Sequence, residues 1–139
     1  MYLTYEEYAS MGGTIEESLF DDYEFGAEAL VNYYTFNRLV GDTDIPTSVK
    51  RLIKYLIGLA QKKASAMSLG DNASDESVVG PYITSQSNDG VSVTYGGAAA
   101  TDLYKMCGNE AKEAIHVYLN GVMNEAGRYL LYRGLYPGE

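Results

Sequence analysis

Apolar residues recur at helical spacing along most of this chain and alternate with polar residues in one stretch only. The helical spacing predicts helices at about residues 5–11, 15–39, 47–65 and 99–123. Thr4 and Glu7 have the spacing of a capping box before the first helix, and Thr14 and Glu17 repeat it before the second. The pattern therefore predicts a mainly α fold, a small helical bundle.

Two of these helices have apolar stripes that we expect to face each other in an antiparallel pair. The stripe of the second helix comprises Ile15, Leu19, Tyr23, Ala27, Leu30, Val31 and Tyr34. The stripe of the third comprises Val49, Leu52, Ile53, Leu56, Leu59 and Ala60. The short loop that contains Pro46 joins them, and a short loop favours antiparallel neighbours.

The alternating stretch lies before the last helix. Ile83, Val91, Val93 and Tyr95 alternate with Ser and Thr, and residues 87–90 form a turn signal that ends in Asp-Gly. This predicts a β-hairpin, or an extended loop, at about residues 82–95. A lone two-stranded hairpin is marginal in water, so it needs either its own helices or another chain to pack against.

The end of the chain, residues 128–139, predicts an extended C-terminal tail. Leu130, Leu131 and Tyr132 lie between Arg128 and Arg133, and a helix-ending run at 124–127 precedes them. We interpret this apolar group flanked by cations as a docking element for another chain. The alternative is that the tail folds back on its own helices.

Charge is unevenly spread along the 139 residues, whose net charge is −9. Residues 1–45 hold acids and a single base, Arg38, whereas residues 46–70 hold bases and no acid. We expect the basic helix to pair with the acidic one before it. A nucleic-acid-binding face and a complementary surface on another subunit are the alternatives. The length predicts one domain, 1–139, and we expect neither a signal peptide nor a membrane partner.

No pattern of catalytic or metal-ligating residues is present. His116 is the only histidine and Cys107 the only cysteine, and no HExxH, GxSxG, P-loop or CxxC sequence occurs. We interpret His116 as a surface or half-buried histidine and Cys107 as a buried, inert thiol. The chain is therefore expected to be no enzyme and to hold no metal and no cofactor. Its 14 tyrosines serve either the core alone or both the core and subunit interfaces.

Three stretches together resemble a known family. They are YLTYEEYASMGGTIEESLFDDYEFGAEALVNYYTFNRL, ITSQSNDGVSVTYGG and YLNGVMNEAGRYLLYRG. The chain is similar here to the head–tail connector (head-completion adaptor) proteins of tailed phages and prophages of Gram-positive bacteria. The resemblance implies a helical fold with a small β element, in a ring, typically twelvefold, docked under the portal protein.

The resemblance also implies roles for two segments. In such proteins the long loop before the last helix contacts neighbouring subunits or the next neck (stopper) or tail protein. Tyr82, Ile83, Val91, Val93 and Tyr95 are the matching subunit-interface candidates. The C-terminal segment reaches the portal, which makes Leu130, Leu131, Tyr132 and Arg133 the portal-docking candidates.

The function expected from the resemblance is that of a structural ring subunit. It would extend the DNA exit channel, through which DNA passes without specific binding, and would lie in the neck of the virion after synthesis in the bacterial cytoplasm. The alternative is a small helical regulatory or adaptor protein that binds a host protein or DNA.

Overall fold

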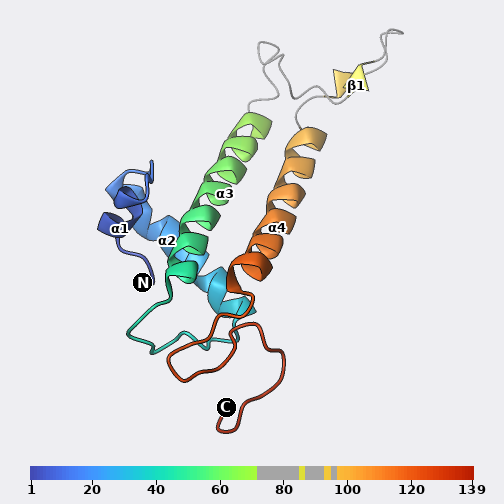
Figure 1. The fold of residues 1–139 in the computed structure, drawn as a ribbon. Coiled ribbons are helices and arrows are strands. Elements are labelled where there is room, and N and C mark those ends of the chain that lie inside the picture. Colours follow the sequence, from blue (N-terminus) through green and yellow to red (C-terminus); the bar gives the residue numbers. More distant parts are fainter. Residues whose placement is uncertain (72–84, 87–92, 95–96) are drawn as a thin grey trace. The chain divides into compact units, whose positions relative to one another are not determined.

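The computed structural model describes residues 1–71, 85–86, 93–94 and 97–139, and the side chains of residues 1–66 and 107–139. It divides into two compact units, one made of residues 1–58 and 111–139 and the other of residues 59–110. The described elements are mainly helical, as predicted (Figure 1). They are α1 (Tyr5–Ser10), α2 (Glu17–Tyr34), α3 (Thr47–Asp71), β1 (Ser85–Gln86), β2 (Val93–Thr94) and α4 (Gly97–Leu119).

The N-terminus of α1 is capped as the sequence predicts. The Thr4 side chain accepts a hydrogen bond from the backbone N–H of Glu7, and the Glu7 carboxylate accepts one from the backbone N–H of Thr4. This reciprocal pair satisfies donors that the first turn of a helix leaves free.

The prediction of a second capping box is wrong, because α2 begins at Glu17 after an N-cap at Glu16 that makes no side-chain hydrogen bond. The hydroxyl of buried Tyr8 accepts hydrogen bonds from the backbone N–H groups of Thr14 and Ile15, at 3.1 and 3.2 Å. These bonds tie both residues to α1, so Thr14 does not cap the next helix.

The stripe predicted for the second helix is confirmed at Ile15, Ala27 and Val31, which are buried, and it is wrong at Leu19. Leu19 is 50% exposed, whereas Phe20 is fully buried, with its ring centroid 5.5 Å from Tyr5 and 5.1 Å from Tyr8. The stripe continues through Glu24, Ala27 and Val31. The aromatic side chains of α1 therefore decide which face of α2 points inward.

Glu24 is a buried carboxylate on that stripe. It accepts hydrogen bonds from the backbone N–H groups of Tyr2, at 2.8 Å, and Leu3, at 3.3 Å. Burial raises its pKa, and the two hydrogen bonds oppose that rise. Glu24 thus holds the segment that precedes α1 against α2.

Helix α2 ends at Tyr34 rather than at residue 39. Phe36 and Asn37 have φ values of 55° and 58°, in the left-handed region, so they cannot continue a right-handed helix. The following loop leads into α3. Its apolar stripe is buried as predicted apart from half-buried Ala60, and Ile57 joins it.

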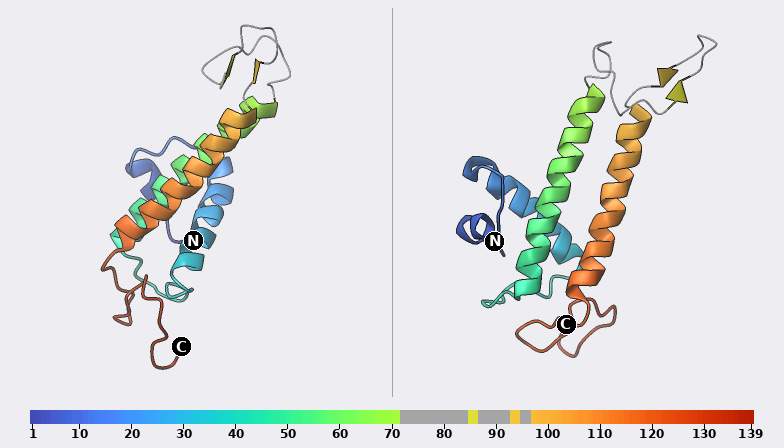
Figure 2. Two further views of the ribbon diagram at one scale, coloured as in Figure 1. Left: turned by 90° about the vertical axis from the view of Figure 1, so that its right-hand side faces the viewer. Right: turned by 45° about the horizontal axis from the view of Figure 1, so that its top comes forward.

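In the first unit, α2 crosses the start of α3 and the end of α4 obliquely rather than running alongside them (Figures 1 and 2). Tyr55 of α3 stacks on Tyr118 of α4 with ring centroids 6.0 Å apart. The core of this unit gathers residues from both ends of the chain. It includes Leu3, Phe20, Val31, Leu39, Val49, Leu52, Ile53, Ile57, Ile115, Leu119 and Leu130.

The first turns of the basic helix bind α1 and the residue that follows it. Lys50 forms an ion pair with Glu7, and Lys54 donates a hydrogen bond to the backbone carbonyl of Met11. These bonds join the first turns of α3 to the first helix of the chain.

In the second unit, α4 runs unbroken through Gly108 and Asn109. β1 and β2 pair antiparallel, with Ser85 opposite Thr94 and Gln86 opposite Val93. The remainder of the predicted hairpin, including Tyr82, Ile83, Val91 and Tyr95, lies outside the described residues. Its role as a subunit interface stays a prediction.

Candidate functional site

The most densely bonded site in the described part of the chain surrounds Arg38, just after the two left-handed residues that follow α2. Its side chain is only 2% exposed. All the acceptors of its guanidinium lie in residues 129–139. In the sequence, Arg38 stands out only as the single base among residues 1–45, and no role was predicted for it.

The guanidinium of Arg38 binds the backbone of this segment at four points. Nη1 donates to the carbonyl oxygens of Tyr129 at 3.2 Å, Leu130 at 3.3 Å and Tyr132. Nη2 donates to the carbonyl oxygen of Gly134 at 2.7 Å. One planar cation therefore fixes the path of residues 129–134.

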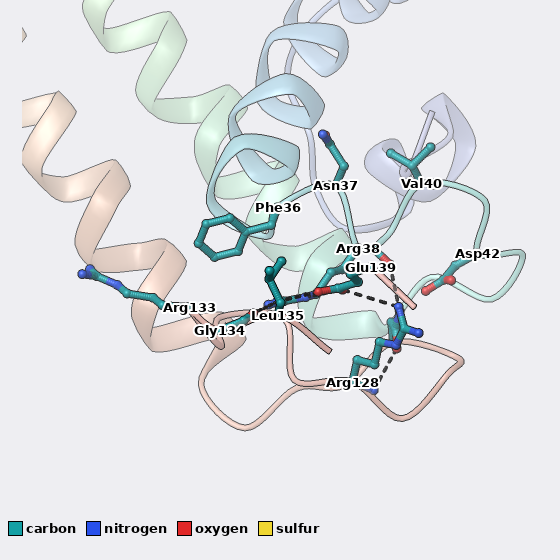
Figure 3. Close-up of a pocket in the computed structure, with 11 residues that line it drawn as sticks. Phe36, Asn37, Arg38, Val40, Asp42, Arg128, Arg133, Gly134, Leu135 and Glu139 are labelled. Carbon is teal, nitrogen blue, oxygen red and sulfur yellow. Dashed lines mark hydrogen bonds and ion pairs between the residues drawn. The ribbon is translucent and has the colours of Figure 1, made fainter. Parts of the chain in front are cut away.

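Glu139 supplies the negative charge opposite Arg38. Arg38 Nε lies 2.9 Å from Glu139 Oε1 and Nη2 lies 3.2 Å from Oε2, a bidentate pair. Arg128 approaches the same Oε1 at 3.5 Å, so the carboxylate lies between two guanidinium groups (Figure 3). Hydrogen bonding to Arg38 first, and to the backbone N–H of Tyr136 second, lowers the pKa of Glu139 from 4.5 to about 2.

Aromatic rings surround the same cation. The guanidinium carbon lies 4.9 Å from the ring centroid of Tyr136, 5.1 Å from that of Phe36 and 5.9 Å from that of Tyr132. The faces of these rings attract a cation. We call Arg38, Glu139 and these three rings the arginine clasp.

A small antiparallel turn leads the chain from α4 into the clasp. Leu130 donates a backbone hydrogen bond to Val122, and Asn124 donates one to Arg128. The side chain of Asn124 donates to the backbone carbonyl of Arg38 at 2.9 Å. Glu125 accepts hydrogen bonds from Thr43 and from the backbone N–H of Asp44, which fastens the turn to the loop before α3.

The four portal-docking candidates differ in exposure. Leu130 is fully buried in the core, Leu131 is half-buried, and Tyr132 and Arg133 are exposed, Tyr132 at 51%. The segment thus folds back on its own unit, which is the alternative that the sequence left open. Its docking to another chain stays a prediction, and Leu131, Tyr132 and Arg133 are the candidates whose side chains reach the surface.

Two hollows lie beside the clasp. One, of about 370 Å³, is lined by Phe36, Val40, Arg128, Leu135 and Glu139 together with six other residues (Figure 3). A second is wider and lies between α2, α4 and the final segment, lined by Tyr33, Tyr34, Phe36, His116, Leu131 and others. Exposed apolar groups gather at these hollows: Tyr33 is 75% exposed, Val40 63% and Leu135 82%.

His116 and Cys107 have the surroundings that the sequence predicts. His116 is exposed on α4, with its ring centroid 6.5 Å from that of Tyr34, and Cys107 is buried. The described residues contain no group of three or more histidine, cysteine or acidic side chains placed to bind a metal. Across this described part, no helix has both the length and the apolar content to cross a bilayer.

No protein-family model matches this chain, and no curated protein or solved structure matches it significantly.

Proposed function

We propose that this protein is a structural subunit of a head–tail connector ring in a tailed phage or prophage of a Gram-positive bacterium. The proposal is carried by the three stretches of sequence that resemble this family, which together cover about half of the chain. The subunit would dock under the portal protein, extend the DNA exit channel and meet the next neck or tail protein. It would act in the virion neck after synthesis in the bacterial cytoplasm.

The exposed apolar side chains of the first unit support an assembled state. Phe25, Tyr33, Val117 and Leu135 are each more than 70% exposed. Tyr33 and Leu135 line the two hollows beside the clasp, and exposed apolar groups that line a hollow mark sites of interaction. Neighbouring subunits and the portal would cover such groups in a ring.

The arginine clasp supports a docking role for the final segment. Arg133 is exposed and lines the same hollow as Phe36, Val40 and Leu135, and exposed Tyr132 precedes it in the chain. Tyr and Arg are residue types enriched at protein interfaces. A portal surface that fits here would present apolar groups with acidic side chains around them, because the exposed Arg133 and the nearby Arg128 carry positive charge.

The net charge of −9 supports passage of DNA without binding. A protein holds DNA by replacing condensed counterions with its own cations. A channel wall made of this acidic chain would offer few cations for that exchange.

The test uses the portal protein encoded by the same phage or prophage, purified as a ring. Size-exclusion chromatography with light scattering should show a complex with one copy of this chain per portal subunit. Electron microscopy of the complex should show an added ring at the DNA exit. If the chain stays unbound in the presence of micromolar portal rings, the connector function is wrong.

A further inference from the structure

The clasp fixes the backbone of the same segment that the proposed function assigns to the portal. Four carbonyl groups of residues 129–134 are bound by one side chain, which lies 91 to 96 positions earlier in the sequence. Residues 129–134 contain no helix and, apart from the single bridge between Met123 and Tyr129, no strand pairing. Without Arg38 they would keep few bonds to hold their shape.

We propose that Arg38 is the positioning residue of the docking surface: it holds residues 129–134 in the shape that the portal binds. The proposal rests on the connector function. Arg38 itself does not touch the portal, because it is buried. It acts through Tyr132 and Arg133, which lie in the backbone stretch that it holds and whose side chains are exposed.

Arginine suits this task for a geometric reason. A guanidinium carries five N–H groups in one plane, and here its three nitrogens all donate, to four carbonyl oxygens and both oxygens of Glu139. A lysine offers three donors on one atom and cannot span these acceptors. A lysine at position 38 would keep the positive charge, but residues 129–134 would lose most of their hydrogen bonds to it.

The ring of Tyr132 is held from two sides. Its centroid lies 5.9 Å from the Arg38 guanidinium carbon and 5.0 Å from the ring centroid of Tyr136. Tyr136 is held in turn, because its hydroxyl accepts a hydrogen bond from the backbone N–H of Tyr129. Tyr132 is therefore fixed before it meets a partner, although half of its surface is exposed.

A segment that is ordered before binding binds more tightly, since complex formation then loses less conformational entropy. If Arg38 were replaced, several side chains and a stretch of backbone would have to become ordered on binding. We expect portal affinity to fall roughly 10- to 100-fold in that case.

The test compares Arg38→Lys with Arg51→Lys, the same change at an exposed arginine of α3. Hydrogen exchange on the free protein should show protection lost at residues 129–139 in Arg38→Lys, with α2 and α3 unchanged. Portal affinity should fall for Arg38→Lys and stay at the wild-type value for Arg51→Lys. If α2 and α3 lose protection as well, Arg38 supports the whole fold and the positioning role is overturned.

A double-mutant cycle tests whether Arg38 acts through Tyr132. The affinity losses of Arg38→Lys and Tyr132→Ala should be less than additive. Those of Arg38→Lys and Tyr33→Ala should add, because Tyr33 is not among the rings that surround the guanidinium. Glu139→Gln provides a milder variant should Arg38→Lys fail to fold. It leaves the four carbonyl bonds in place and should weaken docking less.

Two results separate the proposals. If the wild-type chain does not bind the portal, the connector function fails, and the docking role of Arg38 fails with it. If the wild type binds and Arg38→Lys binds equally well, the connector function survives and the positioning role is overturned. Unchanged exchange at residues 129–139 in Arg38→Lys would also overturn it.

Discussion

At the scale of single residues, the ion pair of Arg38 and Glu139 is an interaction that the sequence pattern does not predict. They stand 101 positions apart, and no local spacing links them. Arg38 does stand out as the only base in a strongly acidic stretch, and that isolation was the one available signal. A lone cation among acids can have a buried partner elsewhere in the chain.

The low pKa of Glu139 makes the clasp sensitive to acid. A carboxyl group whose pKa is about 2 in the folded chain and 4.5 unperturbed stabilises the fold above pH 4.5, and this contribution disappears as the pH falls toward 2. We therefore expect Glu139→Gln to lower the melting temperature at pH 7. The deficit relative to wild type should shrink steadily below pH 4.5, as measured by circular dichroism.

Comparison with Glu139→Gln is needed because the pKa values of Glu7 and Glu125 are also lowered, so the whole protein loses stability in acid. A deficit that stays constant from pH 7 to pH 2.5 would contradict the bidentate pair.

Thr35 is a residue whose polar group lacks a partner. It is fully buried, and its Oγ1 is the one buried side-chain oxygen or nitrogen without a hydrogen-bond partner among the described residues. Thr35→Val keeps the shape and removes the unpaired hydroxyl, so it should stabilise the fold by about 1 kcal/mol. Urea denaturation measures the change.

Thr35→Ser is the matched control for this prediction. It keeps the hydroxyl and removes a buried methyl group, so it should destabilise by about 1 kcal/mol. If Thr35→Val is instead the less stable variant, the hydroxyl has a partner.

At the scale of elements, the start and the buried face of a helix were predictable where neighbouring residues determine them. They were not predictable where side chains distant in sequence determine them. The capping box at Thr4 and the stripe of α3 need only neighbours in sequence, and the structure has both. The start of α2 depends on the Tyr8 hydroxyl, and its inward face depends on rings from α1. Neither effect has a local signature.

The turn after α4 gives a prediction about glycine. Gly127 has a φ of +73°, and its N–H closes the turn by donating to Asn124. Gly127→Ala should destabilise the fold by about 1–2 kcal/mol, because a side chain disfavours this conformation. Thermal and urea unfolding both measure the loss.

The same substitution in a helix should act in the opposite direction. Gly26 lies in α2, and a Cβ atom added there would meet no atom within 4 Å. Gly26→Ala should therefore stabilise the fold by about 0.5–1 kcal/mol. A destabilised Gly26→Ala would mean that this part of α2 is packed more tightly than its exposure indicates.

At the scale of the whole molecule, the helical class was predictable and the fate of the final segment was not. Helical spacing is a property of each segment, so mainly α architecture follows from the sequence alone. The apolar run at residues 130–132 fits both a partner chain and the chain's own core. Whether this run contacts a partner chain or its own core depends on the bonds to Arg38 and on the burial of Leu130. The spacing of apolar residues in the sequence predicts neither of these.

Truncation after Gly127 tests how much the fold depends on that segment. It removes Leu130, whose full burial contributes about 1.5–3 kcal/mol. It also removes every hydrogen-bond acceptor of the Arg38 guanidinium and the Glu139 carboxylate that pairs with it. We expect a chain that melts far below wild type or does not fold, as followed by circular dichroism. A truncated chain with normal melting would show that the clasp contributes little to stability.

The division of the first unit between residues 1–58 and 111–139 has a consequence for how the protein is made. A ribosome releases the chain from its N-terminus, so α1, α2 and the start of α3 emerge long before Leu130 and Glu139. During that interval the guanidinium of Arg38 has none of the partners that it has in the finished fold. Completion of this unit must await the synthesis of residues 130–139, and chains that stall before them would leave its core open to solvent.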